Sequence, residues 1–259
     1  MAKNSRGEMP FLDHLEELRW RIVWSLAALL VGFGIGFTLV VKLNLIRVLQ
    51  APIAPYLPGK LIYTSPADPF SITLSVALMA GIVLASPVII YQVWAFLSPA
   101  LHRHEKRVVI PVIVGAVILF MAGVALAWFW VLPMILGFLM TFQAESLDAM
   151  ISAPGYFGFV MTLALTFGAA FELPVLILAL AALGLVTPRF LARFRPYAFA
   201  LSFALGAFVT PGDFLLASLA LTAPLYLLYE LSVLLTVVIF RKRRANSIAG
   251  EGSPIEGAA

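Results

Sequence analysis

Acidic side chains are the residues of this sequence whose spacing could support chemistry. Glu17 follows Asp13 by four residues and precedes Arg21 by four, so the three share one face of a helix. They could form an ordinary salt bridge along that helix, or an acidic site for a basic ligand. Glu105 could likewise pair with its basic neighbours. With Glu17 it could instead hold a guanidinium bidentately, a geometry that lysine cannot copy.

A second kind of acid is Glu172, which is the single charge between Asp148 and Arg189. An acidic side chain at the centre of a membrane costs about 2.5–3.5 kcal/mol, so its default interpretation is functional. It could line a polar groove, bind a cationic or hydroxylated partner, or be held neutral. The structural alternative is a hydrogen bond to a threonine such as Thr162 or Thr166. Glu230 is interpreted as the interfacial end of the last apolar stretch.

Catalytic and metal-binding patterns are absent from the sequence. It has no GxxxxGK[ST], HExxH or GxSxG motif and no cysteine. His102 and His104 flank Arg103 in a basic segment that repels cations, so we interpret them as solvated. We predict that the protein is not an enzyme and that it has no catalytic residue, metal or cofactor.

Composition identifies the solvent of this chain as lipid. Of its 259 residues 62% are hydrophobic and 12% are charged, and the mean hydropathy is +1.02. An average soluble domain is about half apolar and about one-quarter charged. A soluble enzyme, a disordered regulator and a DNA-binding domain are therefore excluded, and the net charge of +4 is no evidence for nucleic acid.

Apolar stretches of the length that crosses a bilayer, ~20 residues, predict six membrane spans and an all-α polytopic fold. The last two spans are short, and prolines within the spans predict a bent, concave bundle. We expect one domain over residues 1–240, including an amphipathic segment over 9–21 that lies along the inner interface. A basic and then disordered tail over 241–259 should follow. The spans are Ile22–Val41, Pro69–Leu101, Val108–Ala144, Ala149–Pro188, Tyr197–Val209 and Phe214–Phe240.

The basic residues predict the orientation. Fourteen of the seventeen lie in the N-terminal segment, the second and fourth connections and the tail, so the positive-inside rule places both termini in the cytoplasm. The first external connection, Lys42 to Asp68, is rich in proline, which predicts a stiff irregular cap rather than a helix.

Six motifs follow one another along the chain: FLDHLEELR (Phe11–Arg19), SPVIIYQVWAFLSPAL (Ser86–Leu101), HEKR (His104–Arg107), FGAAFELP (Phe167–Pro174), RPY (Arg195–Tyr197) and TPGD (Thr210–Asp213). Together they resemble the TatC family, the multispanning receptor subunits of the twin-arginine (Sec-independent) protein translocase. The resemblance covers about Pro10 to Phe240 and is most specific around Tyr91, Gln92 and Trp94.

The resemblance implies a function for the chain. It implies a cup-like bundle in the inner membrane of a prokaryote that binds twin-arginine signal peptides of folded cargo and assembles an export complex driven by the protonmotive force. It also implies partners, namely TatA-like and TatB-like single-span proteins and further copies of the chain, within the lipid bilayer and without nucleic acid.

The resemblance also assigns residues. Glu17 and Glu105 match the acids that recognise the signal peptide, with Arg19 and Phe96 as supporting positions. Glu172 matches a groove glutamate linked to partner contact. In the external cap and the last loop, the functional positions that match are Pro52, Phe70 and Asp213. Glu16 precedes Glu17, and the Leu-Arg sequence that follows assigns the role to Glu17.

Two other classes of membrane protein could carry a buried glutamate. A proton-coupled small-solute transporter usually shows internal repeats and paired charges within the membrane, whereas one charge dominates here. An intramembrane hydrolase needs a nucleophile with a base or metal ligands inside the spans, and no histidine lies there. Genes for single-span amphipathic partners nearby would favour the translocase.

Overall fold

The structure is a computed structural model of the chain, described for residues 9–57, 59–97, 106–141, 150–182, 184–209 and 216–251. Within these residues the regular elements are helices, and one isolated parallel bridge joins Ile62 to Ser152. The chain forms two compact units, Met1–Ala170 and Phe171–Ala259. The predicted all-α class is therefore confirmed.

Four apolar helical stretches of the described chain are long enough to cross a membrane. They correspond to the first four predicted spans and define a multi-pass membrane protein. A shorter apolar helical stretch, Leu221–Val237, falls within the sixth prediction. The long stretches are His14–Leu43, Asp68–Phe96, Ile110–Thr141 and Ala153–Ala181.

The first unit begins with α1 (Met9–Leu43), a single unbroken helix. The amphipathic segment over 9–21 was expected to lie along the interface before the first span. It is instead the continuous start of the same helix, because no proline or glycine separates it from the apolar run. The polar residues of this segment therefore lie on the same helix as the first span.

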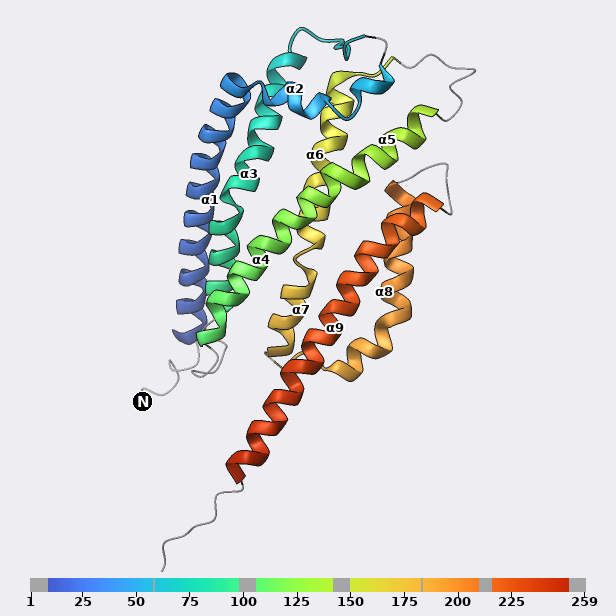
Figure 1. Cartoon of the computed structure of the whole chain (residues 1–259). Coiled ribbons are helices and arrows are strands. Elements are labelled where there is room, and N and C mark those ends of the chain that lie inside the picture. The colour runs from blue at the N-terminus through green and yellow to red at the C-terminus, as the bar shows by residue number, and fades with distance from the viewer. Residues whose placement is uncertain are drawn as a thin grey trace, which may run out of the picture. The chain divides into compact units, whose positions relative to one another are not determined.

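Helix α1 packs along α3 (Asp68–Leu97), and Figure 1 shows the two side by side. Small residues make this close approach possible. A Cβ on Gly32 would lie 2.5 Å from the carbonyl oxygen of Gly81, and one on Gly36 would collide with the carbonyl oxygen of Ala77. Small residues spaced by four let helix backbones meet closely within lipid. This contact fixes the relative register of α1 and α3.

The connection between α1 and α3 is more ordered than its prolines predict. It contains α2 (Leu45–Gln50) and a 3-10 turn, η1 (Ala54–Tyr56), so the prediction of a cap without helix is wrong. The prolines lie outside α2, and Asn44 turns the chain before it with φ 49. Figure 1 shows α2 at the end of the unit where α6 (Ala153–Ala170) begins.

Two contacts tie this cap to the start of α6. Ile62 donates its N–H to the carbonyl of Ile151 at 3.2 Å and accepts from Ala153 at 2.6 Å. The buried hydroxyl of Tyr156 donates to the carbonyl oxygen of Leu49 at 2.7 Å. The cap is therefore held by specific hydrogen bonds as well as by its stiff prolines.

Removing the Tyr156 hydroxyl tests this attachment. In Tyr156→Phe the buried carbonyl of Leu49 loses its donor, which typically costs about 1–3 kcal/mol. We expect the free energy of unfolding in detergent to fall by about that amount. Tyr63→Phe is the matched control, because Tyr63 belongs to the same cap and is 60% exposed. Equal stability of the two variants would show that the bond contributes nothing.

The third apolar stretch is one helical path with a local change of pitch. It comprises α4 (Lys106–Leu126), a π-helical turn η3 (Ala127–Val131) and α5 (Leu132–Thr141). Pro133 lies just after this turn and lacks an N–H to donate, and π-turns absorb such a break in the ladder. Within the first unit, α4 contacts α3 and α6.

The second unit contains α7 (Leu173–Ala182), α8 (Pro188–Val209) and α9 (Leu216–Glu251), and α9 contacts both α7 and α8. Helix α8 begins before the predicted fifth span, so Arg189, Arg193 and Arg195 lie on a helix rather than in a loop. Helix α9 continues to Glu251, beyond the predicted end at Phe240. Arginine, lysine and alanine, which favour helix, are among the residues that extend it, so the part of the tail from Ala245 to Glu251 is helical although it was expected to be disordered.

Glu230 lies within α9 and does not mark its end. Its Oε2 pairs with Nη2 of Arg195 at 2.9 Å, and its Oε1 accepts the hydroxyl of Tyr226 at 2.9 Å. Tyr229 donates to the carbonyl oxygen of Leu191 at 2.6 Å. These polar contacts join α8 to α9.

Candidate functional site

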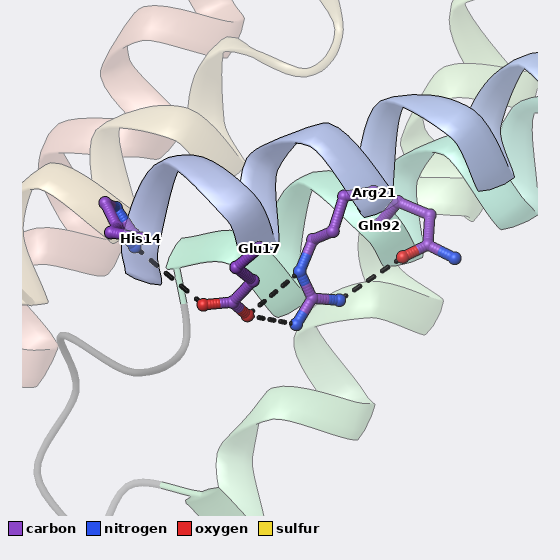
Figure 2. Close-up of polar contacts among 4 residues, drawn as sticks. All are labelled: His14, Glu17, Arg21 and Gln92. Carbon is purple, nitrogen blue, oxygen red and sulfur yellow. Dashed lines mark hydrogen bonds and ion pairs between the residues drawn. The ribbon is translucent and has the colours of Figure 1, made fainter. Parts of the chain in front are cut away.

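A cluster of polar and aromatic side chains lies where the first turns of α1 meet the last turns of α3. His14, Glu17 and Arg21 recur at intervals of three and four, so α1 presents them on one face. Helix α3 supplies Gln92 and Phe96 from its own last turns. Figure 2 shows the four polar members as a chain of contacts across the two helices. We call these five residues the Glu17 cluster.

Arg21 binds Glu17 through two of its nitrogens. Its Nη2 and Nε donate to the same carboxylate oxygen, Oε1 of Glu17, at 2.6 and 3.1 Å. Its third nitrogen, Nη1, donates to Oε1 of Gln92 at 3.2 Å. The predicted salt bridge along α1 is therefore confirmed, and Gln92 extends it to α3.

The other side of Glu17 faces an imidazole. Nδ1 of His14 lies 3.8 Å from Oε2 of Glu17, which is too long for a hydrogen bond. The His14 ring stacks on Phe96 with centroids 4.3 Å apart and planes 13° apart. The Glu17 side chain is 32% exposed, so the carboxylate is accessible and only partly desolvated.

The cluster gathers some of the predicted site residues and leaves out others. Glu17 and Phe96 belong to it, while Arg19 is exposed on α1 outside it. Glu105 and Asp213 lie outside the residues that the structure describes. Sequence reasoning assigned no role to His14 or Gln92. A polar glutamine at the end of an otherwise apolar stretch was the available signal.

The predicted cap positions lie at the opposite end of α1. Pro52 is half-buried beyond α2, and Phe70 is 65% exposed at the start of α3. The 26 residues between Glu17 and the end of α1 at Leu43 span roughly 40 Å of helix. Pro52 and Phe70 therefore cannot share a ligand contact with Glu17.

Glu172 lies at the break between α6 and α7. Its backbone carbonyl accepts the N–H of Leu176 at 2.9 Å and so begins α7. Its side-chain Oε1 is buried and has no hydrogen-bond partner among the described residues. An unpaired buried carboxylate oxygen is costly, which favours a functional interpretation over a structural one.

The described part of the chain holds no group of three or more histidine or acidic side chains placed to bind a metal. The Glu17 cluster instead presents a partly neutralised carboxylate beside stacked aromatic rings, a chemistry suited to binding a cation such as guanidinium. Fold and cluster together define a polytopic helical membrane protein with a cluster of polar and aromatic side chains at one end of α1 and α3.

Comparisons with known proteins specify the class further. Residues 13–224 match the family model "Sec-independent protein translocase protein (TatC)". The TatC protein of Aquifex aeolicus is 39% identical over 239 residues, covering 91% of this chain and 98% of that protein. The TatC protein of Escherichia coli K12 is 37% identical over 227 residues, or 86% of each chain. This chain belongs to the TatC family.

Solved structures agree with this assignment. The crystal structure of a twin-arginine translocase receptor, TatC, superposes with a TM-score of 0.74 at 39% identity, covering 87% of this chain and 98% of that one. A second structure of such a receptor, in the detergent DDM, gives a TM-score of 0.75 over 86% of this chain. The resemblance recognised in the sequence motifs is therefore confirmed.

Proposed function

We propose that this protein is the receptor subunit of a twin-arginine translocase and binds the signal peptides of folded cargo at the Glu17 cluster. The observation that carries the proposal is the accessible Glu17 carboxylate, held between α1 and α3 in a chain of the TatC family. Glu105 supplies the second acid, and Arg19 and Phe96 support the site. Recognition involves no covalent catalysis.

Charge and planarity explain why arginine is the residue recognised. A guanidinium presents N–H donors in a rigid plane that a carboxylate accepts, while an ammonium is a strongly hydrated point charge. A guanidinium also stacks on aromatic rings, and the His14–Phe96 pair lies beside Glu17. The apolar stretch of the signal peptide then inserts along the helices.

The remaining assignments concern assembly. Glu172 and the short fifth and sixth spans form the surface that TatB-like and TatA-like helices contact, and Pro52, Phe70 and Asp213 act in the external cap and last loop. The chain lies in the inner membrane with both termini in the cytoplasm, works with further copies of itself, and uses the protonmotive force. The basic residues support this orientation.

The decisive experiment compares two peptides. The protein in nanodiscs, alone and with a TatB-like partner, is titrated with a twin-arginine signal peptide and with its twin-lysine version. We expect a preference for arginine that disappears in Glu105→Gln. Equal weak binding of both peptides, unchanged by the partner, would contradict the proposal. A preference that appears only with the partner would show that the receptor site needs both subunits.

A further inference from the structure

Arg21 occupies one of the two oxygens of Glu17 and leaves the other open. Two of its N–H groups are directed at Oε1, which uses the acceptor capacity of that oxygen. Within the described residues, Oε2 accepts no hydrogen bond, and its one ion-pair contact is with Nδ1 of His14 at 3.8 Å. A ligand that approaches Glu17 therefore meets a single available carboxylate oxygen.

Gln92 keeps Arg21 in this position. Its side-chain oxygen accepts a hydrogen bond from Nη1 of Arg21. All three guanidinium nitrogens of Arg21 therefore donate, two of them to Glu17 on α1 and one to Gln92 on α3. The Arg21 side chain is only 23% exposed, which restricts the alternatives open to it. Without Gln92 the guanidinium could rotate and cover both oxygens.

We propose that Arg21 and Gln92 are positioning residues that fix the Glu17 carboxylate so that only Oε2 receives the signal-peptide guanidinium. This inference rests on the proposed function. A fork in which both oxygens of Glu17 bind the same guanidinium would require the oxygen that Arg21 holds. The second bond to the same signal arginine must come from another group.

One consequence concerns glutamine at position 17. In Glu17→Gln the single amide oxygen is the better partner for Arg21, so the amide NH2 group turns toward the ligand. A donor then faces the donors of the signal arginine, and we expect twin-arginine binding to weaken about tenfold, as in Glu17→Ala. Adding Arg21→Met frees the amide to rotate and offer its oxygen, which should restore most of the preference.

The measurement is the ratio of dissociation constants for the twin-lysine and twin-arginine peptides in nanodiscs. Loss of the Arg21 charge strengthens binding of both cationic peptides, so their ratio isolates the geometric effect. We expect this ratio to be about threefold or more higher in the double variant Glu17→Gln with Arg21→Met than in Glu17→Gln alone. Arg47→Met, an equal change of charge at an exposed position of α2, should recover nothing in the same background.

A second variant changes no charge. Gln92→Leu should lower the ratio about threefold, because the released Arg21 guanidinium can then cover Oε2 of Glu17. The matched control is Gln50→Leu on α2. An unchanged ratio in Gln92→Leu together with no recovery in the double variant would overturn the positioning role alone. A wild-type protein without arginine preference, with its partner present, would overturn the proposed function.

Discussion

Glu17→Ala is expected to weaken binding of a twin-arginine peptide about tenfold or more, and Glu17→Ala with Glu105→Ala to remove specific binding. A hydrogen bond to a charged group contributes about 1.5–3 kcal/mol, whereas a fully exposed ion pair contributes about 0–1 kcal/mol. Glu17 is 32% exposed and anchored by Arg21, so it belongs nearer the first range. Each 1.4 kcal/mol corresponds to about tenfold in affinity.

Glu16→Ala is the matched control for this prediction. Glu16 is adjacent to Glu17 and is exposed. Its replacement by alanine removes the same charge as Glu17→Ala, so the general electrostatic attraction of the peptide changes equally in the two variants. Peptide titration in nanodiscs at two salt concentrations would measure the difference. Wild-type affinity in both Glu17→Ala and Glu105→Ala would contradict the assignment of these acids. Equal losses of affinity in Glu16→Ala and Glu17→Ala would show that the peptide responds to net charge and not to a specific site at Glu17.

The second large effect is expected from Gly32→Leu, which should prevent α1 and α3 from packing. The new Cβ would start 2.5 Å from the carbonyl oxygen of Gly81, and a backbone atom cannot move aside as a side chain can. Overpacking typically costs about 1–3 kcal/mol, and a backbone obstacle places this variant at or above the upper limit. Because Gln92 reaches Arg21 across the α1–α3 interface, the preference for the twin-arginine peptide should fall as well.

Gly34→Leu provides the control for that variant. Gly34 lies two residues further along α1 and is exposed, and a Cβ there meets nothing within 4 Å. Thermal unfolding in detergent should show a clear loss for Gly32→Leu and little change for Gly34→Leu. Equal stability of both would mean that the helices separate without cost, contrary to the close packing of α1 on α3.

Helices are the part of this fold that sequence predicts best. A run without charges must satisfy its own backbone hydrogen bonds in lipid, so long apolar stretches become helices, as α1, α3 and α6 show. The errors lie where neighbouring groups decide the outcome. Helix α2 forms in a segment rich in proline, and α8 begins among arginines that were expected in a loop.

Sequence reasoning singled out Glu17 and Phe96 of the cluster, but not His14 or Gln92 and not the geometry that joins them. The spacing of Glu17 and Arg21 predicts their salt bridge, because positions four apart on a helix are neighbours. Nothing in that spacing brings Gln92 to Arg21 or stacks Phe96 on His14. Those contacts join residues 71 apart or more, and they follow from the register that Gly32, Gly36 and Gly81 impose on α1 and α3.

The sequence by itself determined the class of this protein, its long spans and its family, because hydropathy acts through local backbone chemistry and the motifs are contiguous. Only the tertiary structure decided how Glu17 is held. One of its oxygens binds Arg21, and among the described residues the other accepts no hydrogen bond. Packing of two helices, rather than residue type, determines where a side chain finds its partners.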